Sequence, residues 1–333
     1  MPNLAIADAI PPGTKITYIG SKKGIESQLV PLKGIQFISV QTGKFRRYFS
    51  LLNFIDLFRI PIGIIQAYLV LRKIKPNIVF SKGGFVGFPV VVAAWLRRIP
   101  AIIHESDAIP GLATKLCAPF AKKILLGYKQ TNSEAFGLKY KKKTQVVGNP
   151  IRPEILKGST AKAKKLTGFK GKKPVLLIIG GSAGAQQLNK IVREEKDRLT
   201  EIFDVIHITG KGKGRKQKSK SYFAIPYANK EMKDLYALAS LALSRAGANS
   251  LAEFEALKLP TLLYPLGRHQ SRGDQMANTQ AMIRKHKFFS LAAENKEAHS
   301  QLILLPKRSK KQLPNDSAQK IANLIMQIYS QAT

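Results

Sequence analysis

The feature that most constrains the fold is a repeated alternation between short apolar runs and segments with helical periodicity. Eleven runs of four to seven residues are rich in aliphatic and aromatic side chains, and most are separated by stretches with apolar residues at i, i+3 and i+4. This βαβα rhythm predicts an α/β fold, in which parallel sheets are covered by helices on both faces. The runs span 15–19, 35–40, 77–81, 101–105, 123–127, 145–149, 175–180, 203–209, 222–226, 241–244 and 261–265.

The rhythm occurs twice, with a break between about residues 150 and 171 that contains prolines and a basic stretch. A chain of 333 residues is also too long for one ordinary domain. We therefore expect two Rossmann-like domains with parallel sheets. A closing helix is expected from about Asn315 to Gln331, because a proline and the polar residues 315–317 precede it.

The net charge of the chain limits the kinds of partner that it is expected to bind. The net charge is +35, from 55 Lys and Arg against 20 Asp and Glu, and it is spread over both halves. Such a surface attracts nucleic acid, anionic lipid headgroups or diphosphates, although a lysine-biased proteome would give the same balance. The longest uninterrupted apolar run, at 85–96, is too short to span a bilayer, and one cysteine cannot form an internal disulfide.

Three glycine-bearing turns each follow a predicted strand and precede a helical pattern. They contain Gly83-Gly84, residues 180–184 and Gly247. The free N–H groups and the dipole of a helix N-terminus favour an anion at such a turn. Tight turns between strands and helices use glycine in any case, but three turns at the ligand-binding edges of two sheets favour a phosphate ligand.

Two polar segments are further candidates for ligand binding. Ser250 and Glu253 have the spacing of a capping box, which is the structural interpretation; alternatively, the helix N-terminus receives a diphosphate and Glu253 accepts two sugar hydroxyls. Residues 269–280 place Asp274 and Gln275 near a second helix start, as a solvated polar turn or as a site for a hydroxyl-rich ligand. His104 ends a strand beside Glu105, either at a catalytic edge or bonded to a neighbouring loop.

Six segments of the chain carry distinctive motifs, namely SKGGFVGFP (81–89), IIHESDAIPGLATK (102–115), VVGNPIR (146–152), IIGGSAGAQQLN (178–189), SRAGANSLAEFEAL (244–257) and PLGRHQSRGDQMAN (265–278). Together these segments resemble the MurG family, the peptidoglycan N-acetylglucosaminyltransferases that make lipid II from lipid I. The variants HESD, SRAG and QSRGDQ are similar to the Firmicutes branch, and the resemblance runs from Pro2 to about Pro306.

The resemblance implies a GT-B fold and an inverting transfer of GlcNAc from UDP-GlcNAc to the C4 hydroxyl of MurNAc in lipid I. It implies an acceptor and membrane-facing domain of residues 1–156, joined by the helix within 315–333, and a UDP-GlcNAc-binding domain of residues 157–314. It implies no cofactor and no metal, and the sequence contains no Asp-x-Asp motif. It also implies a peripheral enzyme on the cytoplasmic face of the plasma membrane, bound to anionic lipid and linked to cell shape and division.

The resemblance places most donor contacts in the second domain. Arg152 and Ser182 are implied to contact the diphosphate, residues 247–252 to present a helix N-terminus to it, and Glu253 to hold the ribose. Asn229 or Ala228 is implied beside the uracil. The implied substrate-binding residues are Asp107, Arg152, Ser182, Asn229, Gly247, Ala248, Asn249, Ser250, Glu253, Asp274 and Gln275.

The remaining implied contacts concern the two sugars and the acceptor. Gln275, helped by Asp274, is implied to bind the GlcNAc hydroxyls, and Asp107 stands where many members have Asn and is implied to touch the sugar. Gly83 and Gly84 are implied to face the lipid diphosphate.

The start of the chain departs from the family pattern. Family members begin with a strand and a glycine-rich turn that ends in a histidine, whereas this sequence begins at the following piece, residues 1–6. The resemblance therefore implies a missing central strand and turn, with either a true start upstream or an impaired product. The usual base would lie in that turn, so His104 or Glu105 is the nearest candidate here.

Other functions stay open from the sequence. One is a different GT-B transferase with a lipid acceptor, such as diacylglycerol. Another is a non-catalytic basic protein that binds membrane or RNA through the loop 210–220, although that loop lacks aromatic residues and nucleic acid is not expected. We also expect membrane contact through the stretch 45–75, where basic residues flank apolar ones, and other cell-wall synthesis proteins as possible partners.

Overall fold

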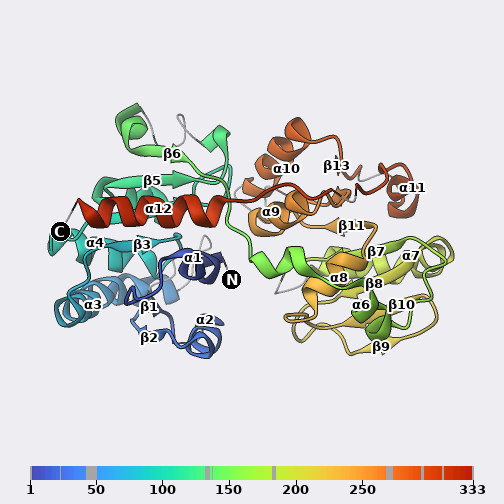
Figure 1. Ribbon diagram of the computed structural model, residues 1–333, viewed down its shortest axis with the longest axis horizontal. Helices are drawn as coiled ribbons and strands as arrows, with labels where there is room; N and C mark the ends of the chain where they lie inside the picture. Colours follow the sequence, from blue (N-terminus) through green and yellow to red (C-terminus); the bar gives the residue numbers. More distant parts are fainter. Residues whose placement is uncertain are drawn as a thin grey trace. The chain divides into compact units, whose positions relative to one another are not determined.

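The computed structural model describes two compact units (Figure 1). Unit 1 comprises Met1–Pro150 and Asp316–Thr333, and unit 2 comprises Ile151–Asn315. The first boundary lies six residues before the 156/157 position expected from the sequence, and the second lies one residue after the expected 314/315 position. The described residues are 2–22, 24–42, 51–131, 136, 138–181, 185–267, 273–293, 296–309 and 311–331, without the side chains of 51–58 and 138.

The described residues of unit 2 form a seven-stranded sheet in which only the edge strand β9 is antiparallel. Helix α7 packs Leu188, Val192 and Leu199 against apolar residues of the sheet. In spatial order the strands are β13 (Phe289–Leu291), β12 (Thr261–Leu263), β11 (Leu241–Ser244), β7 (Val175–Ile179), β8 (Asp204–Ile208), β10 (Tyr222–Ile225) and β9 (Gln217–Lys218).

The strand order of unit 2 marks where a ligand is expected to bind. The chain runs outward from β7 through β8 to β10, and then returns to β11 on the other side of β7 before continuing to β12 and β13. In open α/β sheets, ligands bind at the carboxyl ends of the strands where the order reverses. Here that point lies between β7 and β11, whose ends are joined by the Ser244 hydroxyl, which donates to the carbonyl of Ile179 at 2.8 Å.

Unit 1 contains two separate parallel sheets among the residues that the structure describes. β1 (Thr17–Gly20) pairs with β2 (Gln36–Ser39), whereas a four-stranded sheet has the order β3 (Val79–Ser81), β4 (Ala101–Glu105), β5 (Lys123–Leu126) and β6 (Thr144–Val146). Alternate residues of β4 and β5 point to opposite faces. Ile103 and Ile124 join one hydrophobic cluster, whereas Ile102 and Leu125 join another.

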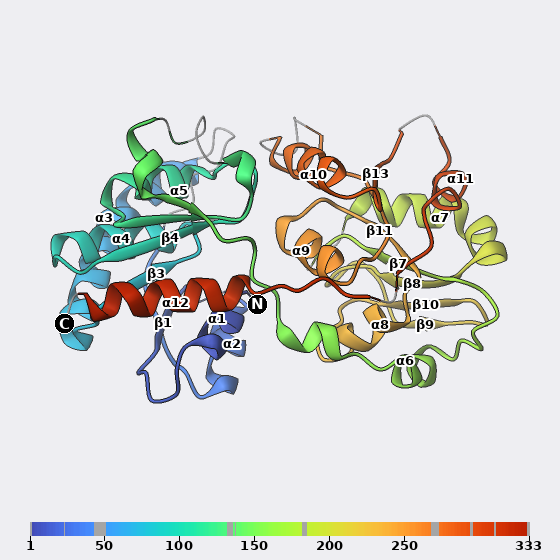
Figure 2. The ribbon, with the colours of Figure 1, turned by 45° about the horizontal axis from the view of Figure 1, so that its top comes forward.

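Helices cover both of these clusters. Leu71 of α3 and Val90 of α4 belong to the first cluster, and Ile6 of α1 and Ile325 of α12 belong to the second. In Figure 2 the C-terminal helix α12 lies beside α1. The helices are α1 (Pro2–Ala9), α2 (Glu26–Leu29), α3 (Leu51–Ile74), α4 (Gly87–Leu96), α5 (Leu112–Cys117), α6 (Thr160–Thr167), α7 (Gln186–Ile202), α8 (Met232–Leu238), α9 (Ala248–Ala256), α10 (Asp274–Lys285), α11 (Ala298–Leu302) and α12 (Ser317–Ser330).

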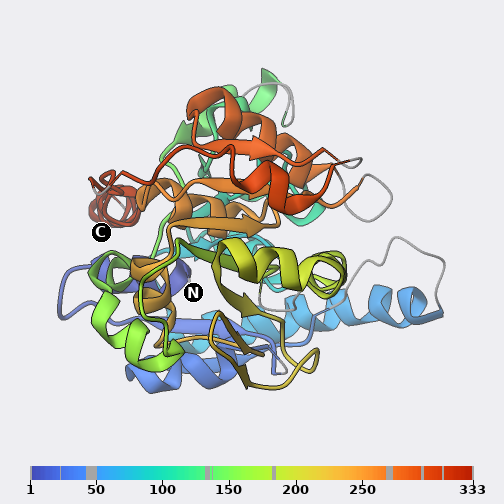
Figure 3. The same ribbon diagram turned by 90° about the vertical axis from the view of Figure 1, so that its right-hand side faces the viewer.

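All eleven strands expected from the sequence are present, with bounds shifted by at most three residues. The strands β9 and β13 were not expected, and β9 lies inside the basic loop 210–220. Figure 3 shows the same ribbon with unit 2 facing the viewer. None of the helices in the described ranges is long and apolar enough to cross a bilayer.

Candidate functional site

Helix α9 begins at the reversal point of the sheet in unit 2. Gly247 follows β11 in an extended conformation and precedes the first helical residue, Ala248. Ala248 is buried, Ser250 is half-buried and Asn249 is exposed. The N–H groups of this first turn therefore lie at the carboxyl edge of the sheet, where the helix dipole favours an anion.

The carboxylate of Glu253 is held by two side chains that are distant in sequence. The hydroxyl of Tyr236, on α8, donates to Glu253 Oε2 at 2.8 Å, and Arg152 Nη2 lies 3.4 Å from Oε1. Both charged side chains are largely but not fully buried. The carboxylate is therefore oriented by its partners and still accessible to a ligand.

Tyr236 is an interior residue with a polar end. It is 1% exposed, and its ring packs edge-on against Phe254 with the centroids 5.9 Å apart. Burial, together with the adjacent Glu253 carboxylate, raises the pKa of the Tyr236 phenol well above its usual value. The hydroxyl consequently stays protonated at physiological pH and acts as a permanent donor to Glu253.

The capping-box interpretation of Ser250 and Glu253 is wrong. Helix α9 begins at Ala248 with Gly247 as its N-cap residue, and no side chain caps it. Ser250 is therefore inside the first turn, and the Glu253 carboxylate bonds Tyr236 and Arg152. The alternative in which Glu253 serves a ligand is compatible with this geometry.

The start of α10 is tied to the same edge of unit 2. Asn278, fully buried, donates to the carbonyl of Ala246 at 3.1 Å, directly before the α9 turn. Gln275 Oε1 accepts the N–H of Leu266 at 3.0 Å, while Asp274 is half-buried at the first helical position. Asn278 thus has a structural contact, and Gln275 lies beside the loop that follows β12.

Asn229 and Ser182, two expected donor-site residues, are not among the hydrogen-bonded contacts described above. Asn229 is exposed in the loop after β10, and its N–H bonds Glu231 Oε2 at 3.1 Å. Ala228 beside it is buried. Ser182 falls in the segment 182–184, which lies outside the described residues.

In unit 1, the turns after β3 and β4 lie side by side. Gly83 and Gly84 adopt φ angles of +78° and +83°, which a residue with a side chain rarely adopts, so the backbone itself requires glycine. The preceding Lys82 extends its ammonium to the Ser106 hydroxyl in the next turn. Burial lowers the pKa of Lys82 to about 8, and the charges of Glu105 and Asp107 partly oppose this shift.

His104 is bonded to a neighbouring loop, which is one of the two alternatives that the sequence left open. It is 0% exposed, and its Nε2 lies 2.9 Å from the carbonyl oxygen of Gly148, after β6. Its Nδ1 is buried without a hydrogen-bond partner among the described residues. Burial, followed by the nearby Lys82 charge, holds the pKa of His104 well below its usual value, so the imidazole is neutral.

Glu105 organises the turn that carries Asp107. Its Oε1 accepts the Asp107 N–H at 3.0 Å and its Oε2 accepts the Gly111 N–H at 2.8 Å. The Asp107 carbonyl in turn accepts the Thr131 hydroxyl at 3.2 Å. Glu105 is buried and Asp107 is half-buried, so Asp107 is the more accessible carboxylate of the two.

Sequence reasoning missed Tyr236 and Lys82. Tyr236 lies in a helical pattern with no local motif, and only the rule that a buried phenol needs a partner could have drawn attention to it. Lys82 directly precedes Gly83, so its position after a strand was an available signal. No group of histidine, cysteine and acidic side chains in the described ranges could hold a metal ion.

Comparisons with known proteins agree with this architecture. Residues 1–126 match the glycosyltransferase family 28 N-terminal domain, and residues 175–327 match the glycosyltransferase family 28 C-terminal domain. The UDP-N-acetylglucosamine--N-acetylmuramyl-(pentapeptide) pyrophosphoryl-undecaprenol N-acetylglucosamine transferase of Legionella pneumophila (strain Lens) is 47% identical over 84% of this chain and 77% of that protein. The chain belongs to the MurG family.

A second relative supports this membership, and a solved structure shows the fold. The enzyme of the same name from Oceanobacillus iheyensis is 46% identical over 82% of this chain and 76% of that protein. The crystal structure of Acinetobacter baumannii MurG superposes with a TM-score of 0.67 at 19% identity, covering 98% of this chain and 95% of that one. The fold is thus the two-domain α/β GT-B fold expected from the sequence.

Proposed function

We propose that this protein transfers N-acetylglucosamine from UDP-GlcNAc to the C4 hydroxyl of the muramic acid unit of lipid I, which gives lipid II and UDP. The support is its membership of a family whose relatives carry the name of this transferase. The observation that carries the site assignment is the Glu253 carboxylate on α9, oriented by Tyr236 and Arg152.

In this proposal the diphosphate of the donor binds at the α9 turn. Gly247 has a negative φ of −72°, and a Cβ built on it would meet no atom within 4 Å. Neither strain nor crowding within the described chain therefore demands glycine there, whereas a ligand that approaches the backbone closely would. Residues 247–250 supply N–H groups, and Ser182 is proposed to add a contact from the neighbouring turn.

Arg152 and Glu253 are proposed to contact different parts of the nucleotide. Arg152 is proposed to move from its long 3.4 Å contact with Glu253 to the diphosphate, where its charge stabilises the UDP leaving group as the glycosidic bond breaks. Glu253, still held by Tyr236, then accepts the ribose hydroxyls. Asn229 or Ala228 is proposed beside the uracil.

The donor sugar is assigned to the start of α10. Gln275 and Asp274 are proposed to bind the GlcNAc hydroxyls, and Gln275 would exchange its bond to Leu266 for one to the sugar. In unit 1, Asp107 is proposed to contact a sugar because it is the accessible carboxylate of its turn.

The acceptor diphosphate is assigned to Lys82, Gly83 and Gly84. The positive-φ glycines turn the backbone at the carboxyl end of β3, and Lys82 adds a positive charge directly beside them. His104 and Glu105 remain the proposed candidates for the base. Both carboxylate oxygens of Glu105 accept backbone N–H groups, from Asp107 and Gly111, so a base role for Glu105 requires a change in these contacts. His104 bonds Gly148 through Nε2, and its Nδ1 has no partner among the described residues but is buried, so a base role for His104 requires that Nδ1 becomes accessible to the acceptor.

Peripheral membrane binding is proposed for unit 1. Exposed apolar residues occur on α3, α4 and α5, which pack in succession, and include Ile65 at 60% and Trp95 at 53% exposure. Basic residues accompany them, and each is worth about 1 kcal/mol near an anionic surface. Residues 45–50 of the stretch 45–75 lie outside the described residues, as do the side chains of 51–58.

The proposed reaction is tested by supplying radiolabelled UDP-GlcNAc with lipid I or with diacylglycerol in matched vesicles. A labelled product from lipid I alone, with anomeric inversion, is expected. Product from diacylglycerol alone would favour the other lipid-acceptor transferase, and binding of vesicles without any product would contradict the enzymatic assignment.

A further inference from the structure

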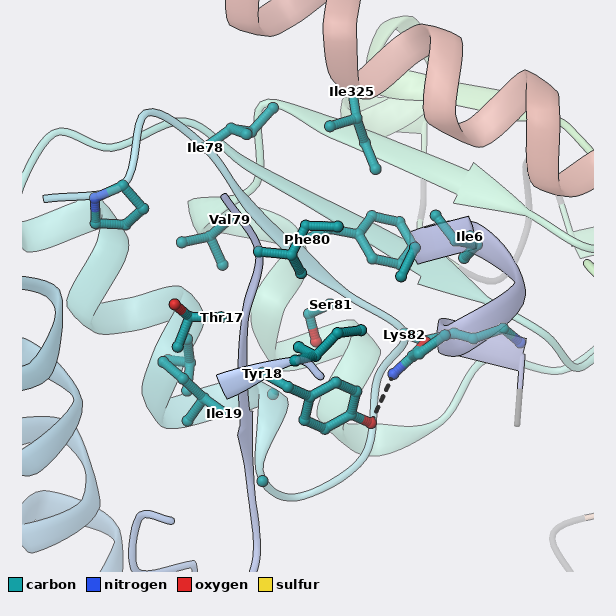
Figure 4. Close-up of a pocket in the computed structure, with 18 of the residues that line it drawn as sticks. Ile6, Thr17, Tyr18, Ile19, Ile78, Val79, Phe80, Ser81, Lys82 and Ile325 are labelled. Atoms are coloured by element: carbon teal, nitrogen blue, oxygen red, sulfur yellow. Dashed lines mark hydrogen bonds between the residues drawn. The ribbon is translucent and has the colours of Figure 1, made fainter. Parts of the chain in front are cut away.

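Two strands of unit 1 border the same cavity. In the part of the chain that the structure describes, β1 pairs only with β2 and β3 pairs only with β4. A cavity of about 550 Å³ lies against the full length of β1 and β3 (Figure 4). We call this cavity the strand slot.

The strand slot has apolar walls on two sides. One wall contains Ile6 of α1 and Ile325 of α12, in the same hydrophobic cluster as Phe80. The other contains Leu71 of α3 and Val90 of α4. In Figure 4 Phe80 and Ile6 point to one side of the view, whereas Val79 and Ile19 point to the other. An occupant would therefore be covered by helices on both faces.

We propose that the strand slot binds an extended peptide segment as an additional β-strand. The backbone of this segment would pair with β1 along one edge and with β3 along the other. A small apolar ligand or a lipid chain could fill the volume, but it could not satisfy the N–H and C=O groups of two strand edges. A peptide backbone satisfies both rows at once, which is the basis of recognition by strand addition.

The surroundings also determine the composition of the segment. A strand covered on both faces reads as a continuous apolar run, unlike the alternating pattern of a strand with one solvated face. β1 has four residues and β3 has three, so a core of about four to six residues matches their length. Its insertion would join the two-stranded and four-stranded sheets into one.

The test uses a fluorescent seven-residue peptide, acetyl-Ser-Val-Ile-Val-Ile-Gly-Ser-amide, with the intact chain. The control peptide carries proline in place of the central valine, because proline removes one N–H and disrupts strand pairing. We expect at least tenfold tighter binding of the first peptide by anisotropy. Amide hydrogen exchange should slow at residues 17–20 and at 79–81 together when that peptide is added.

Matched variants connect the binding to the strand slot. Ile78→Lys places a charge on its wall, and Leu32→Lys is the control because Leu32 is 82% exposed and does not line the cavity. We expect at least tenfold weaker peptide binding for Ile78→Lys and no change for Leu32→Lys. If Ile78→Lys fails to fold, the proline peptide and the exchange data on the unchanged protein still decide the matter.

Several outcomes would overturn the proposal. Equal affinity for the two peptides would show that strand pairing is absent, and protection of β1 or β3 alone would show that the occupant does not bridge them. Protection that rises with protein concentration, with dimers in sedimentation, would identify a second copy of the chain as the occupant. Displacement by decyl maltoside without any peptide protection would identify an apolar small-molecule site.

Discussion

The role of Glu253 can be separated from its structural contacts by a paired substitution. In Glu253→Ala the hydroxyl of Tyr236, a residue that is 1% exposed in the unchanged chain, loses its acceptor. A buried donor left without a partner costs about 1–3 kcal/mol of folding free energy. Loss of stability in this variant is therefore expected, and it says nothing about a ligand.

The double variant Tyr236→Phe/Glu253→Ala removes both hydrogen-bond partners. The phenylalanine ring introduced at position 236 would keep the edge-on contact with Phe254, so most of the stability lost in Glu253→Ala should return. If Glu253 accepts two ribose hydroxyls, the double variant still lacks about 2–4 kcal/mol of binding free energy. This corresponds to a roughly 30- to 700-fold weaker affinity for UDP.

Two measurements on four proteins test this reasoning. Thermal unfolding and UDP calorimetry are performed on the unchanged chain, both single variants and the double variant. Tyr236→Phe alone should keep UDP affinity within about tenfold, since the carboxylate remains. A stable double variant that binds UDP as tightly as the unchanged chain would refute ribose binding by Glu253.

Three further outcomes are expected. Burial and the nearby Arg193 charge lower the pKa of His207 from 6.5 to about 4, so the folded state binds fewer protons than the unfolded state in that interval. The free energy of unfolding is therefore highest above pH 6.5 and decreases by about 3 kcal/mol as the pH falls to 4. Denaturant melts of His207→Gln should show a smaller decrease over the same pH interval. Lys82→Met should raise the KM for lipid I at least tenfold with unchanged UDP affinity, whereas an unchanged KM would remove it from the acceptor site. Trp95→Glu should reduce salt-sensitive sedimentation with anionic vesicles, whereas Leu32→Glu should not; equal behaviour of the two would contradict membrane contact through α4.

The strands could be predicted because parallel strands that are buried on both faces consist mainly of consecutive apolar residues. Val175–Ile179 is buried at all five positions and reads as an uninterrupted apolar run. The strands that were not predicted lack such an apolar run. β9 consists of Gln217 and Lys218, both exposed, and it exists only through antiparallel pairing with β10. β13 lies at the edge of the sheet, and its three residues pass from buried Phe289 to exposed Leu291, so it does not read as an uninterrupted apolar run.

The turns of the candidate site were partly predictable for a similar reason. Glycine at positions 83 and 84 reports a backbone that turns through positive φ, which sequence displays directly. The contact between Lys82 and Ser106 joins two different strand ends, so it depends on the pairing of β3 with β4. The residues around Lys82 in the sequence therefore do not indicate that it contacts Ser106.

Glu253 shows why the choice between a cap and a ligand contact needed the fold. The spacing of Ser250 and Glu253 fits a capping box, but Gly247 places the helix start at Ala248 and moves Ser250 into the first turn. The partners of Glu253 lie 17 and 101 residues away, at Tyr236 and Arg152. Neither of them satisfies a backbone group of α9, so their bonds orient the carboxylate without capping the helix. A carboxylate that is fixed in this way and still accessible is better suited to bind a ligand than to stabilise its own helix.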